Sequence, residues 1–174
     1  MINGNSDIFA AKIVIIKSQP LMGKTCLYID GEEIGIFDSI ERIAPFIKTL
    51  NKLAKDFLLF ENNNLRELSP SAIFYRLNDE GTSKKKFTKE QIHEDRHNLF
   101  LGENFDPWLI SAVYEAPNYL FVWDKLLNGV RQDVRFAKVS LSIIQKVCLE
   151  INQLIPHNDW PRFIDKYVEE SHLG

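Results

Sequence analysis

The chain has 174 residues, of which 45% are hydrophobic and 26% charged, a composition typical of a globular protein rather than a disordered or fibrous one. Its formal net charge of −3 argues against a nucleic-acid partner, because nucleic-acid-binding domains usually carry a basic face, and is compatible with a basic protein partner. The apolar runs are too short to span a bilayer and no leader-like segment opens the chain, so we expect a cytoplasmic protein without a membrane partner.

The N-terminal part of the chain predicts a strand followed by a β-hairpin. Residues 8–17, IFAAKIVIIK, are rich in β-branched residues, and their odd positions form one apolar face. Asp30-Gly31 is typical of a two-residue type I′ turn, because that turn requires positive φ at both positions. The pairs expected around it are Ile29 with Glu32, Leu27 with Ile34 and Thr25 with Ile36. The apolar members of these pairs then share one face, so the turn and the hydrophobic pattern predict the same register.

A long amphipathic helix is expected after the hairpin. Asp38 or Ser39 can cap its N-terminus, with Glu41 completing a capping box. Pro45 either lies in the first turns and bends the helix or marks where the regular helix begins. The three asparagines at 62–64 are expected to end the element. The apolar residues that recur at helical spacing are Ile43, Phe46, Ile47, Leu50, Leu53, Ala54, Phe57 and Leu58.

A shorter helix and a polar loop come next. Ser69-Pro70 predicts an N-cap followed by proline at the first helical position. The apolar face of this helix consists of Ile73, Phe74 and Leu77. Residues 79–92, DEGTSKKKFTKEQI, show no burial pattern, so we expect an exposed loop whose three consecutive lysines are solvated.

The C-terminal half predicts a three-stranded meander. Strands at 108–114 and 119–123 flank a turn at Ala116-Pro117-Asn118, and Asn128-Gly129 joins the second strand to a third at 130–137. The expected pairs are Leu127 with Val130, Trp123 with Val134 and Phe121 with Phe136. The same register places Asp124 opposite Asp133, an unfavourable pair, so we expect a bulge or splaying there.

Two helices are expected to finish the chain, the first ended by Pro156 and the second capped by Asp159. Their apolar faces comprise Ile144, Val147, Cys148, Ile151, Leu154 and Ile155, and then Trp160, Phe163, Ile164, Tyr167 and Val168. Strands and helices thus come in runs, which is typical of an α+β fold. We therefore expect one domain over residues 1–174, with a largely antiparallel sheet packed against about four helices.

One motif suggests catalysis. His93, Glu94 and His97 match the H-E-x-x-H pattern, in which two histidines on one helical face bind zinc and the glutamate acts as general base. The pattern also needs a third ligand, for which Glu115 or His157 could be proposed. Here the segment follows a lysine-rich loop and runs at once into strand-like residues, so a solvated charged segment is the favoured interpretation. A zinc-dependent hydrolase remains the alternative.

The other motifs favour structural roles, and we expect no catalytic residues, metal or cofactor. Cys26 and Cys148 lie in apolar segments and are interpreted as buried reduced thiols. Residues 22–25, MGKT, lack the upstream glycine and the following helix of a phosphate-binding loop. The aromatic strands at 108–123 are more typical of a core than of a binding patch. A small-ligand or adaptor domain using these strands is a further alternative.

Acidic and aromatic residues near predicted turns are the candidates for binding a partner. Carboxylates on exposed loops mostly keep a surface soluble, but in an inhibitor of a basic enzyme they would steer association and cover its phosphate-binding surface. The residues selected on this ground are Glu32, Glu33, Glu103, Asp106, Trp108 and Glu115.

The first third of the chain resembles the Immunity protein 42 family of bacterial polymorphic-toxin systems. The residues that carry the resemblance are Phe9-Ala10, Gly23-Lys24, Cys26-Leu27-Tyr28-Ile29, Gly31-Glu32-Glu33-Ile34-Gly35 and Phe37-Asp38-Ser39. The aromatic strands that begin near Trp108 are compatible with the family, whereas Pro45 departs from its helix and residues 79–105 match no family feature.

The resemblance implies a cytosolic immunity protein that binds and neutralises the C-terminal domain of a cognate toxin, often one delivered by contact-dependent inhibition. We expect a nuclease-type toxin and inhibition by blocking its active site. The resemblance supplies no toxin-binding residues, and it leaves self-association open.

Overall fold

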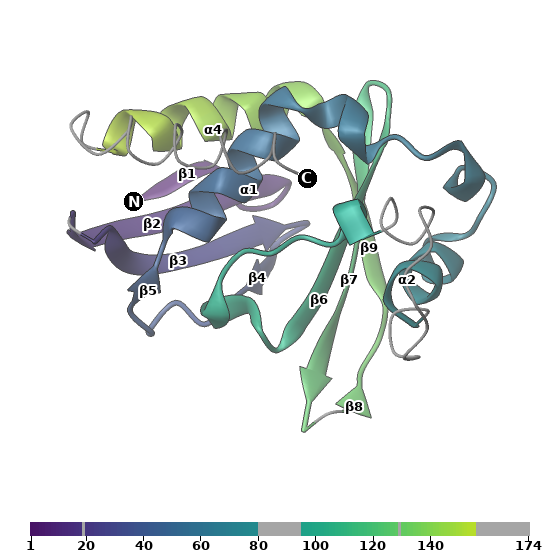
Figure 1. Ribbon diagram of the computed structural model, residues 1–174, viewed down its shortest axis with the longest axis horizontal. Coiled ribbons are helices and arrows are strands. Elements are labelled where there is room, and N and C mark those ends of the chain that lie inside the picture. Colours follow the sequence, from purple (N-terminus) through teal and green to yellow (C-terminus); the bar gives the residue numbers. More distant parts are fainter. Residues whose placement is uncertain (19, 80–94, 129, 156–174) are drawn as a thin grey trace, which may run out of the picture.

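The computed structural model describes residues 1–18, 20–79, 95–128 and 130–155, which form two antiparallel sheets and three α-helices (Figure 1). The first sheet contains β1 (Ile2–Asn5), β2 (Phe9–Lys17), β3 (Met22–Ile29), β4 (Glu32–Ile34) and β5 (Glu41–Arg42). The second sheet contains β6 (Trp108–Glu115), β7 (Asn118–Leu127), β8 (Val130–Arg131) and β9 (Arg135–Ser140). The helices are α1 (Ala44–Lys55), α2 (Pro70–Asp79) and α4 (Leu141–Leu154).

The α+β prediction is confirmed, with three α-helices in the described residues instead of about four. Short 3₁₀ helices supplement them: η1 (Phe57–Phe60), η2 (Asn63–Leu65), η4 (Asp95–His97) and η5 (Glu103–Phe105). The predicted loop after residue 79 and the predicted final helix lie outside the described residues, apart from Asp79 itself, which ends α2. Within the described residues, no helix combines the length and apolarity that a bilayer crossing requires.

The hairpin formed by β3 and β4 has the predicted register near its turn. Asp30 and Gly31 have φ of 51° and 78°, as the two-residue turn requires. The observed pairs include Ile29 with Glu32 and Leu27 with Ile34. Local turn chemistry therefore sets the pairing of these strands, and it places Ile29 and Ile34 in the core.

The predicted Thr25–Ile36 pair is wrong, because β4 ends at Ile34 and the chain then turns away from β3. Gly35 has φ of +109°, and a Cβ at this position would lie 2.9 Å from the ring of Phe105. Packing of η5 against the backbone thus ends the ladder, and Ile36 is 47% exposed.

The predicted capping box is also wrong, because α1 begins at Ala44. Glu41 lies in β5, which pairs with β3, and Ile43 occupies the N-cap without a side-chain hydrogen bond. Pro45 lies at the start of the helix, where its missing N–H costs nothing. Of the two alternatives for Pro45, the one in which it marks the start of the regular helix is therefore correct.

The register of β7 and β9 differs from the prediction by one residue. Leu127 pairs with Val130 as expected, but Phe136 pairs with Val122 instead of Phe121. The expected irregularity beside Asp124 is present: its buried carboxylate accepts a hydrogen bond from the Gln132 N–H at 3.1 Å. Residues 132–134 leave the ladder, so Phe136 moves to the opposite face and is 55% exposed.

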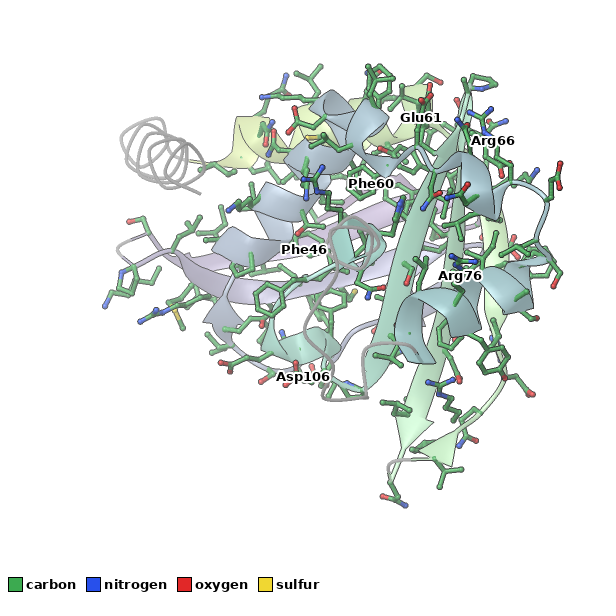
Figure 2. All side chains as sticks on the ribbon, turned by 45° about the vertical axis from the view of Figure 1, so that its right-hand side comes forward. Phe46, Phe60, Glu61, Arg66, Arg76 and Asp106 are labelled. Carbon is green, nitrogen blue, oxygen red and sulfur yellow. The ribbon has the colours of Figure 1, made fainter. Side chains whose placement is uncertain are left out.

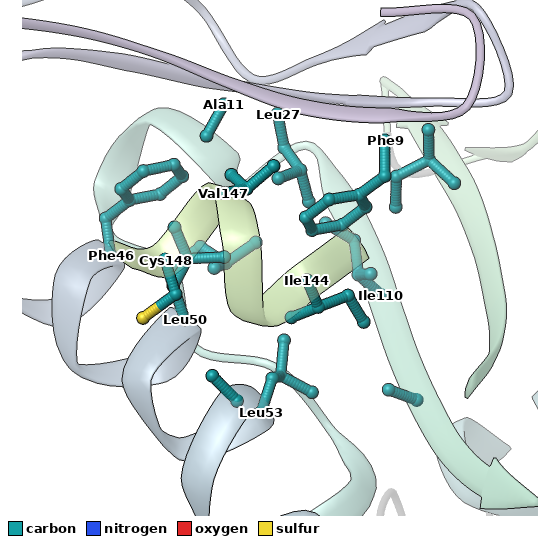
Figure 3. Close-up of a cluster of buried hydrophobic side chains, with 14 of the residues drawn as sticks. Phe9, Ala11, Leu27, Phe46, Leu50, Leu53, Ile110, Ile144, Val147 and Cys148 are labelled. Carbon is teal, nitrogen blue, oxygen red and sulfur yellow. The ribbon is translucent and has the colours of Figure 1, made fainter. Parts of the chain in front are cut away.

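One hydrophobic core joins both sheets to α1 and α4. Figure 3 shows Ile144 and Val147 of α4 between Phe9 and Leu27 of the first sheet and Leu50 of α1. Phe9 stacks on Phe121 of the second sheet, with ring centroids 5.6 Å apart. The helix α2 covers the other face of the second sheet through a separate cluster comprising Leu65, Ile73, Phe74, Leu77, Val113, Leu120 and Val122 (Figure 1).

The buried carboxylate of Glu41 connects β3, β5 and η5. It accepts hydrogen bonds from the Thr25 hydroxyl and from the Asn104 N–H, both at 3.0 Å. The residue is 6% exposed, so water cannot readily replace either bond. Because Asn104 lies within η5, this carboxylate fixes the position of the acidic residues on either side of it.

We expect Glu41→Ala to lower the free energy of unfolding by about 2–4 kcal/mol, because two buried donors lose their acceptor. Urea unfolding monitored by tryptophan fluorescence measures the change. Glu67→Ala, at an exposed glutamate, is the control and should change stability by less than about 0.5 kcal/mol. Equal stabilities of the two variants would contradict the role assigned to Glu41.

Candidate functional site

Glu32 connects the two sheets at the tip of the β3–β4 hairpin. Its carboxylate accepts hydrogen bonds from the indole N–H of Trp123 at 2.9 Å and from the Arg135 guanidinium at 2.8 Å. The Glu32 side chain is 24% exposed, whereas that of Arg135 is 59% exposed. Glu32 therefore has a structural role, and one part of its carboxylate remains open to a partner.

Glu33, the next residue, lies on the exposed face of β4. Its carboxylate accepts a hydrogen bond from the Tyr28 hydroxyl on the paired strand. This hydrogen bond raises the pKa of Tyr28 above its ordinary value, so the phenol stays protonated and continues to orient the carboxylate. Glu33 thus presents an oriented negative charge to solvent.

Glu103 and Asp106 are exposed at η5 and immediately after it. Figure 2 shows Asp106 at the lower rim of the molecule, on the opposite side of the view from Glu61 and Arg66. The segment between the two acids is buried: Phe105 stacks on Phe46 of α1 with ring centroids 5.6 Å apart. These carboxylates therefore stand on a short segment that the core holds in place.

Trp108 lies in the core, as the first residue of β6. It is 9% exposed, and the Lys125 ammonium lies 4.8 Å from its ring centroid. Its indole N–H has no hydrogen-bond partner among the described residues. Trp108 therefore packs in the core next to the segment that carries Glu103 and Asp106, and it offers little surface for direct contact.

Glu115 lies at the other end of β6 and forms an ion pair with Lys138 at 3.7 Å. β6 is eight residues long, so the strand rise of about 3.4 Å per residue places Glu115 about 24 Å from Trp108. A partner would have to extend along the whole strand to contact both ends.

The structure brings the remaining candidates together on neighbouring segments. The Ile36 N–H donates to the Asn104 carbonyl at 3.0 Å, which holds the end of the hairpin against η5. The Asn104 side chain also donates to the Ser39 carbonyl at 3.2 Å. We call the exposed carboxylates on these segments the acidic rim, which consists of Asp30, Glu33, Asp38, Glu103 and Asp106.

Sequence reasoning missed Asp38 as a surface residue of this rim, because its segment was assigned to a helix cap. It also missed Arg135, the partner of Glu32, which lies 103 positions further along the chain. The contact of Arg135 with Glu32 could not be predicted because the expected register of β9 was wrong by one residue. Correct pairing would have placed Arg135 opposite Trp123 and thus beside Glu32.

An open groove lies beside the hairpin tip, with a volume of about 310 Å³. The lining residues are Asp30, Glu32, Trp123, Val134, Arg135 and Phe136. By contrast, the large aromatic side chains of β6 and β7 are at most 9% exposed and belong to the core. The aromatic side chains of these strands therefore belong to the core, as the sequence pattern predicted, and the groove lies beside Trp123 of β7.

The described part of the H-E-x-x-H segment does not form an α-helical metal site. Residues 95–97 form the 3₁₀ helix η4, and the chain then enters a bridge between Asn98 and Ser111. His97 is buried, with Nδ1 2.9 Å from the Ala112 carbonyl oxygen and its ring at 71° to the ring of Phe60. His93 and Glu94 lie outside the described residues. Within the described residues, no three His, Cys, Asp or Glu side chains are grouped to hold a metal ion.

Both cysteines are buried and free. Burial raises the pKa of the Cys26 thiol to about 11 and also raises that of Cys148. The thiolate is the reactive form, so both thiols are poor nucleophiles at neutral pH. Since the pKa of Cys26 is higher in the folded chain, its contribution to stability is retained below about pH 9 and lost as the pH rises toward 11.

We expect both thiols of the native chain to react with iodoacetamide at pH 8.5 at least about 100-fold more slowly than in urea, because folding buries them and keeps them protonated. Mass spectrometry of the labelled protein measures this difference. Rapid labelling of either cysteine in the native chain would contradict a purely structural role.

Comparisons with known proteins identify a family from the sequence and a similar fold among solved structures. The sequence model of the family described as Immunity protein 42 matches residues 1–153. No curated protein matches the chain. Among solved structures, the crystal structure of CdiI from Burkholderia dolosa AUO158 is similar, with a TM-score of 0.56 at 15% sequence identity. The alignment covers 88% of this chain and 99% of that one, and at this identity it shows a shared fold.

Proposed function

The chain belongs to the Immunity protein 42 family, and from this premise we propose that it binds and neutralises the C-terminal domain of a cognate bacterial toxin in the cytoplasm. In this proposal residues 1–174 form a single domain, which acts as an inhibitor without catalytic activity of its own. The similar structure from Burkholderia dolosa is named CdiI, which supports a system of contact-dependent inhibition. Neutralisation by binding requires a complementary surface and no catalytic group.

The observation that carries this proposal is the acidic rim. Its carboxylates lie on segments whose backbones are buried or hydrogen-bonded, so binding does not have to order them first. A preorganised surface loses less conformational entropy on association and therefore binds more tightly for the same contacts. The contacts proposed for the toxin are Glu33, Glu103 and Asp106, with the open part of Glu32 beside them and Trp108 supporting them from the core.

A nuclease-type toxin is the target that fits this surface. An enzyme that acts on nucleic acid needs a basic surface to hold the phosphate backbone. The acidic rim is complementary to such a surface, and the attraction accelerates the encounter of the two proteins. Inhibition then follows from occlusion, because an immunity protein seated on the phosphate-binding surface keeps the substrate away.

Co-expression tests the function directly. The toxin domain encoded immediately upstream of this chain should arrest growth when expressed alone, and co-expression of the wild-type chain should restore growth. The purified proteins should form a complex on size-exclusion chromatography. Growth arrest that persists despite soluble expression of the chain would show that it is not the immunity protein for that toxin.

We expect the double variant Glu103→Lys/Asp106→Lys to associate with the toxin domain at least about 10-fold more slowly at low salt, because reversed charges repel a basic partner. Stopped-flow fluorescence at 20 and 500 mM NaCl measures the rate, and the difference should shrink at high salt. Glu67→Lys changes an exposed charge near α2 and is the matched control. Identical rates for the double variant and the wild type would exclude the acidic rim as the steering surface.

A further inference from the structure

The groove beside the β3–β4 turn follows a free strand edge. Within the described residues, β9 pairs with β7 alone, so its other edge is unpaired, and the groove is lined by Arg135 and Phe136 of β9, by Val134 just before it and by Trp123 of β7. In an antiparallel pair each strand bonds its neighbour through alternate residues, so the intervening residues of β9 direct N–H and C=O groups outward. A free edge of this kind is a template for a further strand.

The groove has an acidic border. Asp30 and Glu32 form one wall, and Asp133 immediately precedes the lining residue Val134. Asp7 lies on an adjacent turn, which is held to the hairpin tip because the Asp30 N–H donates to the Ile8 carbonyl at 3.1 Å. Arg135 is the cation of the groove, and it is already paired with Glu32.

The carboxylates around the groove are available to a partner. Among the described residues, none of Asp7, Asp30 and Asp133 forms an ion pair, and all three are exposed. Two carboxylates, those of Asp30 and Glu32, line the groove beside the single guanidinium of Arg135, which gives its lining a net negative charge, and Asp7 and Asp133 add exposed carboxylates on adjoining segments. Such a site favours a cationic side chain over an anionic one.

Exposed apolar side chains lie on the strands that border the groove. Phe136 is 55% exposed on β9, while Leu127 and Val130 are 49% and 63% exposed at the β7–β8 hairpin. Figure 1 shows this hairpin extending below the rest of the molecule. A partner that enters the groove can therefore cover apolar side chains next to the charged ones. Burial of apolar side chains beside polar contacts is typical of the hot spots that supply most of the binding energy of an interface.

We propose that this groove receives an extended, cation-bearing segment of the toxin domain, which adds a strand to the free edge of β9. A lysine or arginine of that segment pairs with Asp30, and an apolar side chain of the same segment covers Phe136. Main-chain pairing supplies affinity, and these side-chain contacts supply specificity, as in other cases of strand addition. The proposal rests on the proposed function and names the part of the toxin that the site selects.

Calorimetric titration of the full chain with the upstream-encoded toxin domain tests this proposal. Asp30→Asn removes the charge and keeps a residue that tolerates the positive φ of the turn, so the hairpin remains intact. Phe136→Ala removes the apolar contact. Each variant should raise the dissociation constant at least about 10-fold, which corresponds to about 1.4 kcal/mol. Urea unfolding of each variant confirms that the fold is retained.

Two controls make the outcome specific. Glu67→Gln removes an exposed charge that is not part of the groove lining, and Leu58→Ala removes an apolar side chain that is 63% exposed on η1, so both should bind as the wild type does. Wild-type binding with unchanged affinity of Asp30→Asn and Phe136→Ala would overturn the groove proposal and leave the immunity function standing. Failure of the wild type to bind at all would overturn both.

Discussion

The stacking of Phe9 on Phe121 is the contact on which the arrangement of the two sheets depends. It joins β2 to β7, and Tyr119 continues the same cluster by donating its hydroxyl to the Leu53 carbonyl at 2.8 Å. Core packing of this density leaves little freedom for the sheets to rotate against one another. The hydrogen bond from the Trp123 indole to the Glu32 carboxylate also joins the two sheets, so the position of the hairpin tip depends on how the sheets are packed.

Those parts of the fold that depend on local chemistry could be predicted from the sequence. The Asp30-Gly31 turn set the pairs nearest to it, and Ser69 caps α2 by accepting from the Ala72 N–H at 3.3 Å. The parts that could not be predicted depend on residues distant in the sequence. β4 ends earlier than predicted because Phe105 packs on Gly35. Glu41 is not part of the predicted helix N-terminus because its carboxylate accepts hydrogen bonds from Thr25 and Asn104.

The candidate site was predictable to a similar extent. The positions of Glu33 at the predicted hairpin tip and of Glu103 and Asp106 in the segment before Trp108 indicated exposed carboxylates, and all three are exposed. Exposure alone could not separate Glu32, whose carboxylate is engaged by Arg135, from its neighbour Glu33. The groove could not be predicted, because the register of β9 is shifted by one residue at the irregularity beside Asp124. The sequence indicated this irregularity only through the unfavourable pairing expected between Asp124 and Asp133. The family resemblance seen in the first third of the chain extends over residues 1–153.

Hydrogen–deuterium exchange of the chain, free and in complex with the toxin domain, measures whether the toxin binds at the hairpin tip and the edge of β9. We expect slower exchange on binding for amides of residues 135–139 and for the segments at 30–36 and 103–106, because pairing and occlusion protect them. Amides near the β6–β7 turn at residues 115–118 should exchange at unchanged rates. Protection confined to that turn or to α2, with no change at β9 and the hairpin tip, would show that the toxin binds elsewhere on the surface.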